Sequence, residues 1–360
     1  MELMPAAINR TAARHRRPWR YPSFMLTKAD IRRHSGYLPE SEKEIPPLRA
    51  GYYVVDSDVS IAGDAPKDFV RVYEPGTGRK RNVKTWPAYV VKLGHKWYPS
   101  ESITEHLLTR IGQTLRFNMA DSRLVRAEGQ VRFMSRYFLR PHRQQLVHGA
   151  EIFAQHLQDE EFVRQAEEAK LDGDMLDFQF VHEAVRAVFK DPTAKAILED
   201  YVRMLAFDAI VGNNDRHHYN WGVVVDIRGT RSPQFSPIYD TARSLFWNHG
   251  DAQVAMSNGS SQREKFLDGY IRRASPKIGW NGRGRISHFE LVSLIVEGYP
   301  AYRPLLSSII APNDIGRVRA MMRREFASII TTSRFELILE CLEQRMGMFC
   351  RIVNAGGTHA

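Results

Sequence analysis

The spacing of the apolar residues changes once along the chain, and this change constrains the fold more than any other feature. From Gly51 to Leu139 apolar residues recur near every second position, in segments such as "GYYVVD", "DFVRVY", "AYVVKL" and "VRFMSRYFL". That spacing is typical of half-buried strands. After Leu139 the spacing becomes helical, apart from two short β segments at 221–226 and 233–240. The sequence therefore predicts an α+β protein, β-rich in its first half and mostly helical in its second.

Three parts follow from this pattern. Residues 1–50 are rich in Pro and Arg and predict a basic arm that connects to the first strand. Residues 51–139 predict a small antiparallel sheet with one helix at 100–115. Residues 140–360 predict a helical lobe, in which a β hairpin follows the long buried helix "DPTAKAILEDYVRMLAFDAIVG". A chain of 360 residues is long enough for two lobes that share a wide interface.

The composition excludes several classes of protein. An apolar fraction of 43% and a charged fraction of 26% are ordinary for a folded globular chain. No apolar stretch reaches the roughly 18 to 20 residues that a membrane span needs, and the Arg-rich start does not read as a secretory signal. We therefore expect no membrane contact and a cytoplasmic location, with export as an effector left open.

The two cysteines, Cys341 and Cys350, fall nine residues apart in one predicted helix. That spacing separates them by about 13 Å along the helix axis. A disulfide joins Cα atoms at most about 7 Å apart, so both should be free thiols. A metal site built from several cysteines is excluded.

The chain carries a net charge of +10, which invites a nucleic-acid interpretation. The charge is scattered, however, and its densest runs are "RHRRPWR" (14–20), "RKRNVK" (79–84) and "MMRREF" (321–326). No zinc-finger, zipper or RNA-binding signature accompanies them. Direct nucleic-acid binding is therefore not the expected main function, because a solvated basic face or a site for ATP and acidic partners explains the charge as well.

The segment "GNNDRHHYN" (212–220) crowds polar residues directly after the apolar run "MLAFDAIV". Asp215 and Asn220 are five apart, the spacing at which protein kinases place a catalytic aspartate and a magnesium-binding asparagine. Asp240 ends a predicted strand twenty residues later, so a hairpin would return its carboxylate beside Asn220. Such an oxygen-ligand pair suits magnesium. Taken alone, the segment favours a helix C-cap and turn, since Asn and Asp bond their own backbone.

Two upstream residues favour the catalytic interpretation. Lys92 ends the strand "AYVVKL", and Glu105 follows on the next predicted helix. Kinases use a strand lysine for the ATP phosphates and a helical glutamate to hold it. A surface ion pair explains each residue singly, so their order in the chain carries the information. His217 and His218 have no third metal ligand at a suitable spacing, and Arg216 faces either a substrate phosphate or an acidic neighbour.

The ordered motifs "DVSIAGDAPK", "AYVVKLG", "TEHLLTRIG", "FMSRYFL", "GNNDRHHYN" and "SPIYDTA" together resemble the HipA-like bacterial serine/threonine kinases. The resemblance runs from about Val59 to Ala242. It implies a bilobal protein-kinase-like fold, ATP and Mg²⁺ as cofactors, and a protein hydroxyl as acceptor. It also implies relatives among the toxins of toxin-antitoxin systems, so an antitoxin partner is a further expectation. The sheet begins near Gly51, which suggests the short form with the kinase core only.

The resemblance also implies roles for individual residues. Asp215 would be the catalytic aspartate, with Asn220 and Asp240 as magnesium ligands. Lys92, oriented by Glu105, would hold the ATP phosphates, and His217 would brace the loop while His218 is peripheral. The hinge, whose backbone would bond adenine, corresponds to Met134, Ser135, Arg136 and Tyr137. The phosphate-binding loop corresponds to Ser60, Ile61, Ala62 and Gly63, and Ser60 matches a serine that some members autophosphorylate.

Some features depart from this pattern or leave alternatives open. Asp64 and Pro66 depart from the family's phosphate loop, and an acid there would repel phosphates. "EPGTGRK" (74–80) is a rival Gly-rich loop, but its composition favours a hairpin turn. A phosphoinositide-type lipid kinase remains an alternative because that class uses a similar "DRHxxN" loop. A catalytically silent scaffold or nucleic-acid binder is another. Within the family, protein substrates range from aminoacyl-tRNA synthetases to other proteins.

Overall fold

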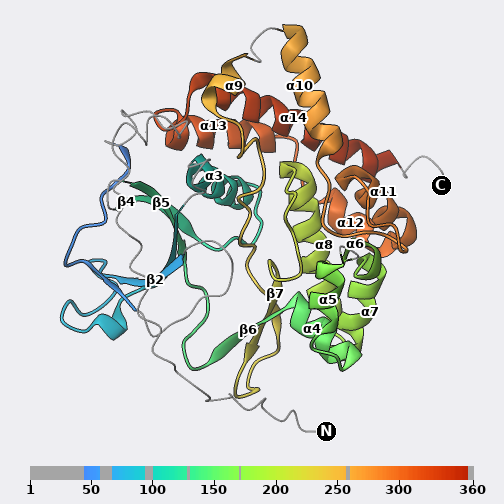
Figure 1. Ribbon diagram of the computed structural model, residues 1–360, viewed down its shortest axis with the longest axis horizontal. Helices are drawn as coiled ribbons and strands as arrows, with labels where there is room; N and C mark the ends of the chain where they lie inside the picture. The colour runs from blue at the N-terminus through green and yellow to red at the C-terminus, as the bar shows by residue number, and fades with distance from the viewer. Residues whose placement is uncertain are drawn as a thin grey trace.

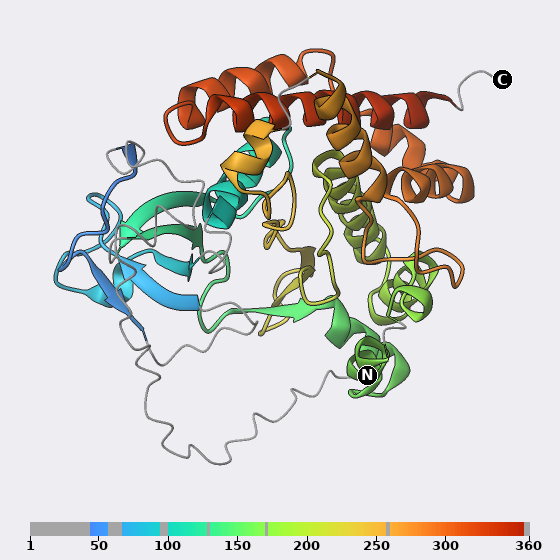
Figure 2. The same cartoon turned by 45° about the horizontal axis from the view of Figure 1, so that its top comes forward.

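The computed structural model describes residues 44–56, 67–93, 100–127, 130–169, 172–256 and 260–355. Within these ranges a β-rich lobe and a helical lobe stand side by side (Figures 1 and 2). The predicted fold class, β-rich first and mostly helical afterwards, is confirmed.

The β-rich lobe is built on a five-stranded antiparallel sheet with strand order β1-β2-β3-β5-β4. One face is covered by helix α3 (Ser100–Thr114), and the other carries a small separate apolar core that includes Val70, Val91 and Met134. This division arises because successive side chains of a strand face opposite sides. The loop "EPGTGRK" lies between the paired strands β2 and β3 and leads into the short helix η1 (Val83–Thr85). The strands are β1 (Tyr53–Val55), β2 (Lys67–Val72), β3 (Ala88–Leu93), β4 (Ser122–Ala127) and β5 (Gln130–Arg136).

The helical lobe surrounds α8 (Thr193–Val211), whose residues are almost all buried from Ile197 onward. Three strands form a second sheet in the order β6-β7-β8: β6 (Gln144–His148), β7 (Gly222–Asp226) and β8 (Gln234–Phe235). β6 corrects the expectation that the chain is helical directly after Leu139. The other helices are α4 (Gly149–Leu157), α5 (Phe162–Glu168), α6 (Asp172–Met175), α7 (Phe178–Val188), α9 (Asp251–Met256), α10 (Ser260–Arg273), α11 (His288–Gly298), η2 (Pro300–Tyr302), α12 (Arg303–Ser307), α13 (Asp314–Phe326) and α14 (Thr332–Asn354).

The C-terminal helices connect the two lobes. Figures 1 and 2 show α13 and α14 lying across the top of the molecule, with α13 packed on α3. Arg110 of α3 forms a two-pronged ion pair with Glu325 of α13, with Nε–Oε2 at 2.6 Å. Both cysteines are free, as predicted. Among the described residues, no helix is long and apolar enough to cross a membrane.

Candidate active site

The loop 212–220 begins where α8 ends. Gly212 adopts a left-handed conformation with φ of 72°, a conformation that glycine adopts without strain. Its N–H donates to the Asp208 carbonyl at 2.8 Å, which closes the helix. Beneath this end the buried Arg345 donates from Nε to the Ala209 carbonyl at 2.8 Å. A positive charge is favourable there because the C-terminal end of a helix dipole is negative.

A buried ion pair fixes the start of the loop. The Arg216 guanidinium donates to both carboxylate oxygens of Asp208, at 2.8 Å from Nε and 3.0 Å from Nη2. Both side chains are almost fully buried. The Asn213 amide also donates to Asp208 Oδ1 at 2.9 Å. Of the two alternatives left open for Arg216, the structure therefore shows the acidic neighbour.

The same arginine joins the loop to the segment before Asp240. Arg216 Nη1 donates to the Asn220 carbonyl and to the Tyr239 carbonyl, each at 2.7 Å. One guanidinium thereby holds Asn220 and the residue before Asp240, although twenty residues separate Asn220 from Asp240. Asp240 has φ of 55°, a left-handed conformation that aspartate tolerates better than most residues do.

Asp215 and Asn220 are oriented by bonds within the loop. The Asn220 amide nitrogen donates to the Asp215 carbonyl at 2.8 Å, and the Asp215 N–H donates to Asn213 Oδ1 at 3.1 Å. The amide oxygen of Asn220 has no hydrogen-bond partner within the described part of the chain. Around the Asp215 carboxylate, the cation Arg243 stands with Nε 4.0 Å from Oδ2. The loop backbone is thus held by hydrogen bonds, while the amide oxygen of Asn220 could bind a metal and the carboxylate of Asp215 could act as a base.

Lys92 lies between two carboxylates. Its Nζ donates to Glu105 Oε1 at 2.7 Å and to Asp240 Oδ1 at 2.9 Å. A second lysine, Lys67 on β2, stands 3.8 Å from the other Asp240 oxygen. The lysine of the sheet, the glutamate of α3 and the aspartate after β8 therefore meet at one point.

The electrostatics of this cluster follow from one cation shared by two acids. Burial would lower the pKa of Lys92, but Asp240 and Glu105 outweigh it and the pKa is raised. Burial would raise the pKa of Asp240, yet Lys92 and Lys67 lower it. For Glu105 burial prevails over Lys92 and raises its pKa to about 7. Asp240, which keeps 30% of its side chain exposed, is thus the acid that stays ionised.

The raised pKa of Glu105 gives a testable pH dependence. A carboxyl whose folded pKa is raised contributes stability below its unfolded pKa near 4.5, and this contribution is lost as pH rises through about 7. Glu105→Gln should remove this loss. Chemical unfolding of both proteins between these pH values should show that the free energy of unfolding of the wild type, relative to that of the variant, falls as pH rises. Taking the difference between the two proteins cancels the contribution of the histidines, which both contain. A difference that does not change with pH would contradict the raised pKa of Glu105.

Some predicted site residues lie at the end of β5, and others fall outside the described ranges. Ser60, Ile61, Ala62 and Gly63 fall in 57–66, outside the described residues. Met134, Ser135 and Arg136 form the end of β5, which pairs with both β3 and β4. The N–H of Arg136 donates to the Asp121 carbonyl at 2.7 Å, and that of Tyr137 to the Ala88 carbonyl at 2.9 Å. These two donors are therefore already used within the sheet.

The two histidines of the loop differ in environment. His217 Nδ1 accepts the Tyr219 N–H at 3.3 Å, and burial lowers its pKa despite the nearby Asp215 and Asp240. His218 is buried against Phe153, with ring centroids 4.9 Å apart. Burial lowers the pKa of His218 to about 3, so it stays neutral. The ring of His218 therefore belongs to the core beneath the loop, and its role in the site stays a prediction.

The donor set fits magnesium better than a transition metal. Within the described ranges no group of three or more His, Cys, Asp or Glu is placed to hold a metal. Asn220 and Asp240 instead offer one amide and one carboxylate oxygen, ligands typical of a magnesium ion that keeps waters and binds substrate phosphates. The bond from the Asn220 nitrogen to Asp215 leaves the oxygen of that amide for such a role.

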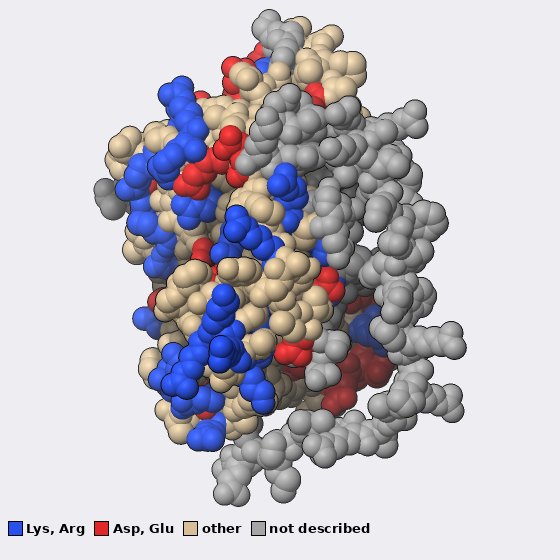
Figure 3. Space-filling view, turned by 90° about the vertical axis from the view of Figure 1, so that its left-hand side faces the viewer, with Lys and Arg blue, Asp and Glu red and all other residues tan. Residues whose placement is uncertain are grey.

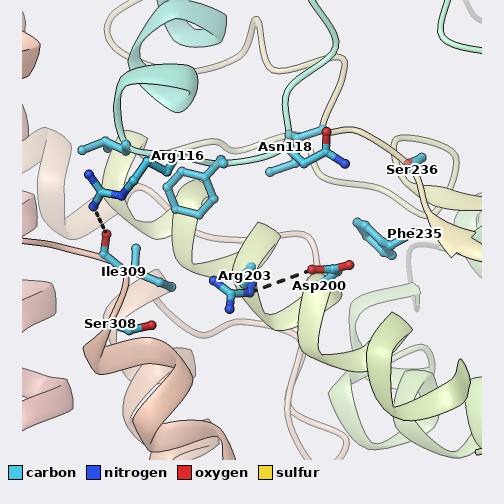
Figure 4. Close-up of a pocket in the computed structure, with 11 residues that line it drawn as sticks. Arg116, Asn118, Asp200, Arg203, Phe235, Ser236, Ser308 and Ile309 are labelled. Carbon is cyan, nitrogen blue, oxygen red and sulfur yellow. Dashed lines mark hydrogen bonds and ion pairs between the residues drawn. The ribbon is translucent and has the colours of Figure 1, made fainter. Parts of the chain in front are cut away.

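A cavity of about 360 Å³ lies elsewhere, between the chain after α3, α8 and the end of α12 (Figure 4). Arg116, Asp200 and Arg203 are among its lining residues, and Arg116 is held by Asp314. None of Lys92, Glu105, Asp215, Asn220 or Asp240 lines it. This cavity is therefore separate from the candidate active site.

Sequence reasoning missed three residues that shape the site. Asp208 anchors Arg216, Lys67 adds a second cation beside Asp240, and Arg243 stands beside Asp215. Only Asp208 gave a local signal, because a single acid within the apolar run "MLAFDAIV" must find a buried partner. Lys67 and Arg243 reach the site through long-range folding.

Fold and site together define a two-lobed, kinase-like protein. The sequence profile of the HipA-like C-terminal domain family matches residues 59–291. The chain belongs to this family. Its structure is similar to that of the proinflammatory kinase CtkA of Helicobacter pylori, with a TM-score of 0.66 and 15% identity, covering 86% of this chain and 98% of CtkA. At that identity the likeness concerns the fold.

Two further similarities are weaker. HipA of Shewanella oneidensis MR-1, solved in a complex with HipB and operator DNA, gives a TM-score of 0.48 and 14% identity, covering 81% of this chain and 64% of HipA. Y4dM of Sinorhizobium fredii, a predicted kinase, is 31% identical over 65 residues, which are 18% of this chain and 15% of Y4dM. The chain thus matches only a small part of that curated relative.

Proposed function

We propose that the chain is an ATP-dependent protein kinase of HipA type, which transfers the γ-phosphoryl group of ATP to a serine or threonine hydroxyl. The observation that carries the proposal is the meeting of Lys92 with Glu105 and Asp240, at 2.7 and 2.9 Å, beside a loop that presents Asp215 and Asn220. Family membership and the kinase-like fold support it.

In this proposal each residue has a separate task. Lys92, held by Glu105, positions the phosphates, and Asp215 orients the acceptor hydroxyl and takes its proton. Asn220 and Asp240 hold Mg²⁺, which supplies charge neutralisation for the phosphates when bound. The bond between the acceptor oxygen and the γ-phosphorus forms as the bond from that phosphorus to the bridging β,γ oxygen breaks, and ADP leaves. Adenine would find its backbone partners after Tyr137, because the Arg136 and Tyr137 N–H groups are already bonded.

The test is incubation of the purified chain with γ-labelled ATP, Mg²⁺ and a generic protein acceptor, beside Asp215→Ala and Asp240→Ala. We expect acid-stable label in phosphoserine or phosphothreonine with the wild type, and a loss of orders of magnitude in both variants. Equal labelling by all three proteins would exclude the proposal.

The finer expectations rest on the family resemblance and are part of the same proposal. They comprise autophosphorylation at Ser60, an aminoacyl-tRNA synthetase or other protein as substrate, an antitoxin partner and a cytoplasmic location. Peptide mapping of the labelled chain tests autophosphorylation at Ser60 directly, since label at another residue would exclude it.

A further inference from the structure

Strand β1 forms one edge of the five-stranded sheet, and no strand of the described residues pairs with its outer side. On its inner side the Tyr52 carbonyl accepts the Tyr73 N–H at 2.7 Å, and the Asp56 N–H donates to the Phe69 carbonyl at 2.8 Å. Inward and outward bonding residues alternate along an antiparallel strand. The N–H and C=O groups of Val55, which lies between inward-bonding positions, therefore face outward.

This edge also exposes apolar side chains. Tyr52 is 39% exposed, Val54 42% and Val55 50%. Natural sheets usually protect an edge with charge, proline or a covering segment. The opposite edge follows that rule, because residues 46–48 lie along β4, where the Arg126 N–H donates to the Pro46 carbonyl and the Leu48 N–H to the Arg126 carbonyl, both at 2.9 Å. Within the described part of the five-stranded sheet, the β1 edge therefore combines unpaired backbone with exposed apolar surface.

A basic loop borders the same edge. The loop after β2 places Lys80 Nζ 5.8 Å from the centre of the Tyr52 ring, so the charge of Lys80 lies at the start of β1. Figure 3 shows Lys and Arg side chains gathered on this side of the β-rich lobe. Among the described residues, the exposed cations of this loop and of the turn before β1 have no ion-pair partner: Arg49, Arg79, Lys80, Arg81 and Lys84.

We propose that the β1 edge is a docking site for an extended, acidic segment of a partner protein. The segment adds a strand to the sheet through the outward backbone groups of Val55, covers Val54 and Tyr52, and places its carboxylates on the basic loop. A second copy of this chain fits poorly, because its own β1 edge carries the same positive charge. Nucleic acid lacks the alternating amide donors and carbonyls that the edge backbone requires. The inference is independent of phosphoryl transfer.

The test uses a fluorescent peptide of alternating valine and glutamate as the probe, with fluorescence anisotropy as the readout. Val55→Pro removes only an outward N–H, a position where proline is tolerated on an edge strand. We expect it to weaken peptide binding about tenfold, the equivalent of one lost hydrogen bond. A peptide with N-methylated backbone amides should bind equally weakly to the wild type, which tests the strand pairing without altering the protein.

A charge-reversed pair tests the basic loop. Lys80→Glu with Arg81→Glu should also weaken binding at least about tenfold, whereas the matched pair Arg228→Glu with Arg231→Glu, in the exposed β7–β8 loop, should leave it unchanged. The proposal is overturned if the wild type does not bind the acidic peptide, or if Val55→Pro and the N-methylated peptide bind as tightly as their parents. It is equally overturned if a single-stranded oligonucleotide displaces the peptide and binds the Val55→Pro variant undiminished, since the surface would then recognise phosphates.

Discussion

Asp240→Asn is expected to lower the rate of phosphoryl transfer by roughly a thousandfold while tightening ATP binding in the absence of magnesium. The loss of rate follows from removing an anionic oxygen that the proposed metal needs. The gain in metal-free binding follows because Asp240 now holds Lys92 at 2.9 Å and would repel the phosphates. Asparagine keeps the shape of the side chain but has no negative charge to oppose them.

The two effects can be measured separately. Nucleotide affinity is determined by calorimetry in EDTA, and the rate by label transfer over a range of Mg²⁺ concentrations. Glu105→Gln is the matched control, because it also removes a carboxylate from Lys92 but no proposed metal ligand. It should lower the rate less and leave the Mg²⁺ dependence unchanged. If Asp240→Asn weakens metal-free ATP binding as much as it lowers the rate, the assignment of Asp240 is wrong.

The change should also reach Glu105. Asp240 is among the groups that raise the pKa of Glu105, after burial. In Asp240→Asn the negative charge of Asp240 is gone and Glu105 is the one carboxylate that pairs with Lys92. The pKa of Glu105 should therefore fall. The pH window in which Glu105 affects stability would then move toward lower pH. This coupling links the two carboxylates through one lysine and is absent if they act independently.

The parts of the fold that were predicted from the sequence are those with a strong local pattern. β2 and β3 are rich in Val, Phe and Tyr, and α8 has a long apolar run ended by Gly212. β4 was missed because two of its residues are arginines, one of which, Arg123, pairs with Glu74. β6 was missed because "QQLVH" has few apolar residues and is held by pairing with β7, far along the chain. Pairing at that distance leaves no local trace.

The candidate site shows the same division. The spacing of Asp215 and Asn220 and the order of Lys92 and Glu105 could be read along the chain, because kinase-like sites keep these residues on successive elements. The sequence did not predict that the guanidinium of Arg216 joins the loop to the segment before Asp240. Sequence reasoning left Arg216 undecided, since an arginine among polar residues can face either a phosphate or an acid.

Arg216→Met is expected to lower the free energy of unfolding by about 3–5 kcal/mol. The variant leaves the Asp208 carboxylate buried without its cation and removes donors from the Asn220 and Tyr239 carbonyls. Denaturant unfolding measures the loss. Asp208→Asn combined with Arg216→Met should cost less than the two single changes added together, because neither partner then remains as an uncompensated charge.

A role for Arg216 in positioning the site predicts more than lost stability. Where Arg216→Met is still folded, its transfer rate should require a higher Mg²⁺ concentration, because Asn220 and the Asp240 segment are no longer held together. Arg334→Met is the matched control: Arg334 is also buried, with an ion pair to Asp251 at 2.6 Å and bonds to two backbone carbonyls, but it contacts neither proposed metal ligand. It should be destabilised without a changed Mg²⁺ requirement. An equal requirement in both variants would reduce Arg216 to a purely structural residue, whereas a higher requirement in Arg216→Met alone would show that one guanidinium sets the geometry of both ligands.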